Sequence, residues 1–171
     1  DNGQRHIKGP NMRYENKNMQ FLPNGNENFC GIISHMKSEY NGDISSIIDI
    51  TSSSVIGSSY SPYNAIAFDD RSKIFESEDR PGSWICFEFK KKSIIPSHYQ
   101  IRTYSNGNYH PKSWVIESSN DGISWEILDK QSNCPKLNGS NTTMVFPIKK
   151  NNLKELRFIR MKLTSETWYN N

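Results

Sequence analysis

Apolar residues follow two different periods along the chain, and the period changes near residue 43. Before that point, one set recurs at the i, i+3, i+4, i+7 and i+11 spacing of a single helical face: Phe29, Ile32, Ile33, Met36 and Tyr40. Gly42 follows this set as a stop signal. The spacing predicts one short amphipathic helix over residues 27–41.

After residue 43 the apolar pattern changes to a period of two. In the segment 84–89, alternate residues from Ile85 to Phe89 share one face and those from Trp84 to Glu88 share the other, which predicts a half-buried strand. Similar short runs predict further strands at 47–56, 99–104, 113–118, 125–128, 142–148 and 156–163.

Turn signals separate these runs at residues 80–82, 105–108, 120–122 and 138–139. The sharpest is Asp121-Gly122, since this pair supplies the positive φ that a tight hairpin needs. Many short strands without intervening helices indicate an all-β, antiparallel sandwich or barrel. We expect Trp114 and Trp125, on either side of the turn, to fix the register by cross-strand contact.

Domain organisation follows from length and from the character of the N-terminus. The 171 residues suit one domain with a substantial core. Residues 1–26 are polar and glycine-rich with isolated apolar side chains, which predicts an extended arm that docks by a few side chains. The expected domain is therefore 27–171, with the arm before it.

Charge narrows the range of partners. The 21 basic and 18 acidic residues give a net charge of +3 and form no concentrated basic stripe, so nucleic acid is not an expected ligand. The basic runs 90–92 and 149–150 lie at predicted turns and fit solvated loop charges. The sequence has no apolar run of membrane-spanning length, and membrane contact is not expected.

The three cysteines favour a reducing compartment. Cys30, Cys86 and Cys134 cannot all pair, and their spacing matches no zinc motif. We therefore predict a cytoplasmic protein. The sequons that begin at Asn138 and Asn141 are the opposing signal, because they would accept glycans in a secreted protein.

Catalytic chemistry is not indicated. The histidines at positions 6, 35, 98 and 110 are dispersed, and no nucleophile elbow, phosphate-binding glycine loop or dinucleotide motif occurs. Acidic pairs such as Asp69-Asp70 fit solvated turns better than a glycosidase site. We expect a protein that is not an enzyme.

Four blocks in the order 64–70, 82–89, 113–128 and 156–163 resemble the discoidin (coagulation-factor type C) family. The most characteristic is the apolar strand followed by Asn120-Asp121-Gly122 and then Trp125. The segment Phe29-Cys30-Gly31-Ile32 resembles intracellular versions from unicellular eukaryotes, which often follow a BTB-type segment.

The resemblance implies a jelly-roll-like β-sandwich of the galactose-binding-domain type, with a final strand expected after residue 171. It also implies that a structural calcium could lie near Asp69 and Asp70, and no other cofactor is expected. Ligands of this family bind to loops at one end of the sandwich. The corresponding segments are 57–63 and 105–111, which carry Tyr60, Tyr63, Asn106, Tyr109 and His110.

Three binding functions remain open at this point. The leading hypothesis is a non-enzymatic, intracellular protein-interaction or scaffold module, in an adaptor, cytoskeletal or ciliary assembly with protein partners. The alternative is a lectin-like module that binds galactose-type glycans. A lipid-binding module is a third possibility, but the candidate loops offer tyrosines and little Arg or Lys.

Overall fold

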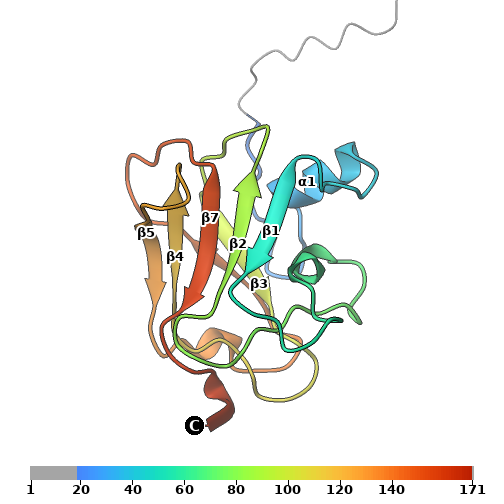
Figure 1. The fold of residues 1–171 in the computed structure, drawn as a ribbon, viewed down its shortest axis with the longest axis vertical. Helices are drawn as coiled ribbons and strands as arrows, with labels where there is room; N and C mark the ends of the chain where they lie inside the picture. Colours follow the sequence, from blue (N-terminus) through green and yellow to red (C-terminus); the bar gives the residue numbers. More distant parts are fainter. Residues whose placement is uncertain (1–18, 171) are drawn as a thin grey trace, which may run out of the picture.

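The computed structural model describes residues 19–170 of the chain. Within that range, one α-helix precedes seven strands, and three short 3-10 turns lie among or after them (Figure 1). The elements are α1 (Ile32–Glu39), β1 (Ile48–Ser52), η1 (Pro62–Ile66), β2 (Trp84–Phe89), β3 (His98–Arg102), β4 (Trp114–Ser119), β5 (Glu126–Gln131), η2 (Pro135–Leu137), β6 (Thr143–Pro147), β7 (Phe158–Leu163) and η3 (Trp168–Asn170). None of the helices in the described range is long and apolar enough to cross a membrane.

The strands form the predicted antiparallel sandwich. One sheet has the order β1-β2-β7-β4-β5, and the second consists of β3 and β6. Figure 1 shows β3 behind the plane of the larger sheet, with α1 beside β1. All seven predicted strands are present. The further strand expected after residue 171 stays a prediction, because the described chain ends in η3.

The limits of several elements differ from the sequence expectation. The helix is shorter than the predicted 27–41, because Gly31 at its N-cap offers no side-chain acceptor and residues 41 and 42 have positive φ. The strand predicted over 47–56 ends at Ser52, since the chain then turns so that the Ile56 N–H donates to Glu76 O at 3.1 Å. Leu156 forms only an isolated bridge with Ile94 ahead of β7.

The larger part of the core lies between the two sheets around Trp114. Its side chain is fully buried and meets the Phe146 ring edge-on, with centroids 5.4 Å apart. The Trp114 indole N–H donates to the Tyr99 hydroxyl at 3.0 Å, and this hydroxyl donates to Asp129 at 2.6 Å. Since Tyr99 belongs to β3 and Asp129 to β5, these two hydrogen bonds connect the sheets.

A second group of buried side chains joins α1 to β1 and β2. Met36 from the helix is buried with Ile48, Ile50 and Phe89. Ile85 and Phe87 pack against the same group, which confirms the predicted inward face of β2. The segment that precedes the sandwich is thus part of its core.

The predicted contact between Trp114 and Trp125 is wrong. Trp114 lies opposite Gln131 in the β4–β5 register, with its ring inside the sandwich. Trp125 lies before β5 and packs against Phe158, with the Arg160 guanidinium 3.7 Å above its ring. The two rings are on different sides of the sheet, so they do not fix the register together.

The turn at Asp121-Gly122 has the predicted positive φ at Gly122 but belongs to a longer loop. Ser118 pairs with Glu126, so seven residues connect the strands instead of two. The Asp121 carboxylate accepts the N–H groups of Ile123 and Ser124 at 2.8 Å and the Ser119 hydroxyl at 2.9 Å. These bonds hold the pKa of Asp121 far below its usual value.

The described part of the predicted arm docks on the smaller sheet through Asn26. The Gln100 side chain donates to Asn26 O at 2.6 Å, and the Val145 N–H donates to the Asn26 side chain at 3.0 Å. Residues 1–18 of the predicted arm lie outside the described range.

We expect Trp114→Phe to lower the free energy of unfolding by about 2 kcal/mol, because it leaves a void between the sheets and removes the donor to Tyr99. Urea unfolding followed by tyrosine fluorescence would measure the loss. Trp84→Phe is the matched control, since Trp84 is only half-buried. An equal or larger loss in the control would contradict the assigned role of Trp114.

Candidate functional site

Three interstrand connections and the C-terminal segment meet at the lower end of the sandwich in Figure 1. We call this the loop end; it comprises residues 53–58, 75–83, 103–113, 132–142 and 164–170. Backbone hydrogen bonds tie these segments together: Asn141 N–H to Tyr104 O at 3.1 Å, Cys134 N–H to Lys112 O at 2.8 Å, and Trp168 N–H to His110 O at 3.1 Å. The loop end is therefore a connected surface.

A pair of stacked tyrosines is exposed at the loop end. The Tyr109 and Tyr169 rings are nearly parallel, at 9°, with centroids 4.2 Å apart. About half of each residue remains exposed, 46% for Tyr109 and 50% for Tyr169. Gly107 shapes the turn before Tyr109, because it has a positive φ that other residues rarely adopt. The rings form an open aromatic platform.

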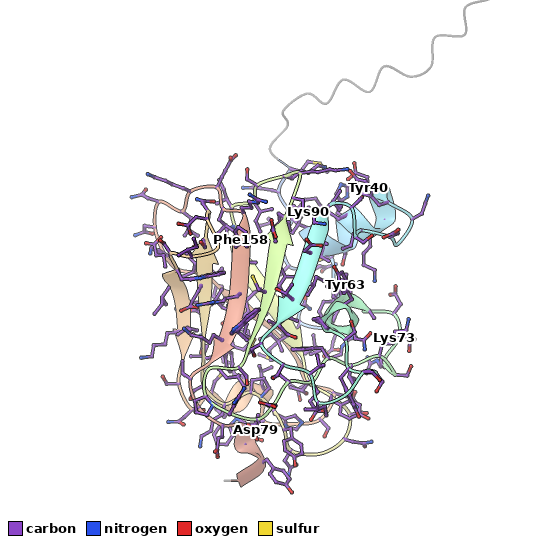
Figure 2. The ribbon with its side chains drawn as sticks, in the orientation of Figure 1. Tyr40, Tyr63, Lys73, Asp79, Lys90 and Phe158 are labelled. Carbon is purple, nitrogen blue, oxygen red and sulfur yellow. The ribbon has the colours of Figure 1, made fainter. Side chains whose placement is uncertain are left out.

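Asp79 holds the C-terminal half of this platform in place. Its carboxylate accepts the Thr167 N–H and the Thr167 hydroxyl, both at 2.8 Å. The Trp168 indole N–H donates to Cys134 O at 3.3 Å, and the Lys112 ammonium lies 5.1 Å from the centre of the same indole ring. Tyr169 is thereby fixed against a loop that lies far away in sequence. Figure 2 shows Asp79 near the lower end.

Negative charge accompanies the platform. A hydrogen bond with Tyr169 raises the pKa of Tyr109, and the Asp79 and Glu76 carboxylates add to the effect. Partial burial raises the pKa of Glu76, and the neighbouring Asp79 charge acts in the same direction. The Tyr109 hydroxyl therefore stays neutral and can donate and accept hydrogen bonds.

His110 lies below the surface next to Tyr109. It is 3% exposed, and neither ring nitrogen has a hydrogen-bond partner among the described residues. Burial lowers the pKa of His110, while the nearby Asn138 side chain and Tyr104 backbone oppose the effect. His110 is therefore a buried residue of this loop, unlike its exposed neighbour Tyr109.

The other predicted loop residues lie apart from one another. Asn106 is exposed in the same loop as Tyr109, and Tyr60 is half-buried against Gly57. Tyr63 lies in η1, and its hydroxyl reaches Asp49 of β1 at 3.5 Å. Figure 2 shows Tyr63 beside β1, well away from Asp79. The structure brings together Asn106, Tyr109 and His110 but not Tyr63.

Asp69 and Asp70, where the family resemblance allows a structural calcium, lie between η1 and β2. Asp70 accepts the Ser72 N–H at 3.0 Å and the Ser72 hydroxyl at 2.6 Å, and these bonds lower its pKa. Among residues 19–170, no three His, Cys, Asp or Glu side chains are arranged to hold a metal ion. The calcium site predicted at Asp69 and Asp70 gains no support from these contacts.

Sequence reasoning missed Tyr169 and Asp79. Neither lies in the loops that the family resemblance indicates. Only the fold brings Tyr169 onto Tyr109 and Asp79 to Thr167. The segment Thr167-Trp168-Tyr169 carried one usable signal, since two aromatic residues near a chain end need a surface on which to pack.

Residues 49–171 match the F5/8 type C domain, and the chain therefore belongs to that family. No curated protein matches it. The helix α1 lies outside the matched range.

Several solved structures with a similar fold are bacterial binding modules. One is CBM32-5 of CpGH89 from Clostridium perfringens in complex with GalNAc-beta-1,3-galactose, at 13% identity, covering 71% of this chain and 87% of the module, with a TM-score of 0.57. The family 32 CBM of NanJ from the same organism, in complex with galactose, has 11% identity, 71% and 85% coverage and a TM-score of 0.56. A chitosan-binding module from Paenibacillus sp. IK-5 has 19% identity, 68% and 82% coverage and a TM-score of 0.52. At these identities the likeness shows the fold.

We expect the stability of the protein to fall as the pH drops below about 6.5, because the unfolded chain then takes up a proton that buried His110 resists. His110 alone contributes a slope of at most about 1.4 kcal/mol per pH unit to the free energy of unfolding. This slope vanishes above the pKa that His110 has in the unfolded chain.

Urea unfolding between about pH 7.5 and pH 5.5 would measure this dependence. His110→Gln should flatten it, whereas His98→Gln, at an exposed position, should leave it unchanged. A slope that survives His110→Gln would show that other groups cause it.

Proposed function

We propose that this chain is a non-catalytic carbohydrate-binding module that takes its ligand at the loop end. The observation that carries the proposal is the exposed Tyr109–Tyr169 platform on a set of loops fixed by hydrogen bonds. A rigid scaffold that displays aromatic rings among polar groups is a common form of ligand site.

The chemistry of the platform suits a sugar ring. The apolar C–H face of a pyranose can lie on an exposed tyrosine ring, while the ring hydroxyls meet hydrogen-bonding groups at the rim. Such groups are present at the loop end: the tyrosine hydroxyls, the Glu76 carboxylate and the exposed Asn106 amide. Because the loops are held in place before binding, little ordering cost accompanies ligand capture.

The structural neighbours support this proposal. Two of them are in complex with galactose or a galactose-containing disaccharide, and a third is described as chitosan-binding. These properties belong to the neighbours, and the fold alone does not transfer them. They favour the lectin-like hypothesis over the scaffold hypothesis.

The cytoplasmic location stays a prediction, which rests on the three cysteines. Cys30, Cys86 and Cys134 are all free, and burial raises the pKa of the Cys86 thiol to about 11. Free thiols fit a reducing compartment. Asn138 and Asn141 are both exposed, so the opposing signal from the sequons is also compatible with the fold.

Glycan binding should depend on the platform. We expect the protein to bind galactose-terminated or amino-sugar oligosaccharides in a glycan array, and Tyr109→Ala or Tyr169→Ala to weaken binding at least about tenfold through loss of the stacking surface. Isothermal titration with the best glycan would give the affinities.

Tyr63→Ala is the matched control, because Tyr63 is 39% exposed but lies beside β1. The glycan affinity of Tyr63→Ala should equal that of the wild type. Binding that weakens equally in Tyr63→Ala would place the site elsewhere, and a folded wild-type protein that binds no glycan would overturn the proposal. Partners captured from deglycosylated lysate would then favour the scaffold hypothesis.

A further inference from the structure

Four asparagine–glycine pairs lie within the described range, and the fold places them in different hydrogen-bonding environments. They begin at Asn24, Asn41, Asn106 and Asn138. Asparagine is one of the thermolabile residues. A following glycine favours loss of the asparagine side-chain amide, because no side chain shields the glycine backbone nitrogen. All four asparagines are exposed, so exposure does not separate the pairs.

Backbone conformation does not separate three of these pairs either. Gly25, Gly42 and Gly107 all have positive φ, at 72°, 88° and 73°. The nucleophile in the loss of the amide is the glycine backbone nitrogen. The difference that matters is therefore whether this nitrogen already donates a hydrogen bond.

The glycine N–H is hydrogen bonded in two of the pairs. The Gly42 N–H donates to a carbonyl of α1 at 2.7 Å, and the Gly139 N–H donates to Leu137 O at 2.9 Å. Among the described residues, the N–H groups of Gly25 and Gly107 have no hydrogen-bond acceptor. A bonded nitrogen must leave its acceptor before it can attack, so the pairs at Asn41 and Asn138 react only after a local opening.

The pair at Asn106 lies at the tip of the connection from β3 to β4, within the loop end. From Tyr104 to Tyr109, no backbone N–H donates a hydrogen bond to another described residue. The Asn106 side chain also has no hydrogen-bond partner in the described range, so its amide carbon can approach the Gly107 nitrogen without breaking a contact. Covalent change of the chain concentrates at exposed loop tips of this kind.

We propose that Asn106 is a site of spontaneous deamidation at the loop end. The Gly107 nitrogen attacks the side-chain carbonyl carbon of Asn106 and forms a new C–N bond. The side-chain nitrogen leaves as ammonia and takes the proton of the Gly107 N–H with it. Water then opens the succinimide ring at either carbonyl, which yields aspartate or isoaspartate. Nothing is oxidised or reduced, and water is the only co-reactant.

The products alter the loop that carries Tyr109. Each product replaces a neutral amide by a carboxylate, in a loop where the Tyr109 hydroxyl already interacts with the charges of Glu76 and Asp79. Isoaspartate also adds a carbon to the main chain ahead of Tyr109. Deamidation therefore changes the aromatic platform as the protein ages, and its effect on glycan binding rests on the proposed function.

Peptide mapping of aged protein tests the proposal. Trypsin would release the four pairs on separate peptides, since a lysine or arginine lies between each pair and the next. In mildly alkaline buffer, Asn106 and Asn24 should lose their amides at least about fivefold faster than Asn41 and Asn138, because the latter two require a hydrogen bond to open first. Mass spectrometry with fragmentation would give the extent of reaction at each asparagine.

Unfolded protein is the matched reference for this measurement. In urea the native hydrogen bonds are lost, so the four asparagines should react at similar rates. An unreactive Asn106 in the folded protein, equal rates for Asn106 and Asn41 in the folded protein, or a ranking that persists in urea would each overturn the proposal.

A second measurement tests the effect on the platform. Aged wild-type protein should bind its best glycan at least about threefold more weakly than fresh protein. Asn106→Gln keeps an amide but must form a larger ring to react, so its fresh and aged samples should bind alike. Equal binding by fresh and deamidated wild-type protein would contradict the effect on the platform. If fresh wild-type protein binds no glycan, the proposed function fails, whereas peptide mapping still decides whether Asn106 is modified.

Discussion

The hydrogen-bonded contact between Trp114, Tyr99 and Asp129 sets the spacing of the two sheets on which the loop end depends. Trp114 and Asp129 come from adjacent strands of the larger sheet, and Tyr99 comes from the smaller one. The segment that carries Tyr109 runs from β3 to β4, so its two ends are attached to the strands that this contact joins. A change in the distance between the sheets would move both ends of that loop. The buried polar bridge therefore positions an exposed platform that it does not itself contact.

The strands of this fold could be predicted from the sequence because the evidence for each strand is local. Alternation over five or six residues identifies β2, and the turn residues beside it limit its length. The local sequence does not determine which side chains meet across strands. The pairing of Trp114 with Gln131 depends on a seven-residue loop and on a bulge after Ile116, and neither follows from the spacing of the two tryptophans. A register shift of one residue exchanges the faces, so the predicted contact between Trp114 and Trp125 was sensitive to both details.

The candidate site could be predicted only in part for the same reason. The family resemblance indicated the loop of Tyr109, but its stacking partner Tyr169 follows 60 residues later and is fixed by Asp79, which precedes it by 90. Nor does residue type determine exposure: His110 and Tyr109 are adjacent, yet one is buried and the other is half exposed. A histidine side chain suits either environment, and only the contacts of the folded loop decide between them.

The segment before residue 49 packs into the core of the sandwich and also contacts its helix side. Met36 of α1 is buried with Ile48 and Phe89, so the helix completes a core that the matched family region does not close alone. On the opposite side of the same segment, Phe29 and Lys37 meet Phe68 and Arg102 of the sandwich. Cation–ring contacts of this kind contribute about 0.5–2 kcal/mol each, which is enough to hold the segment but leaves the formal charges in place.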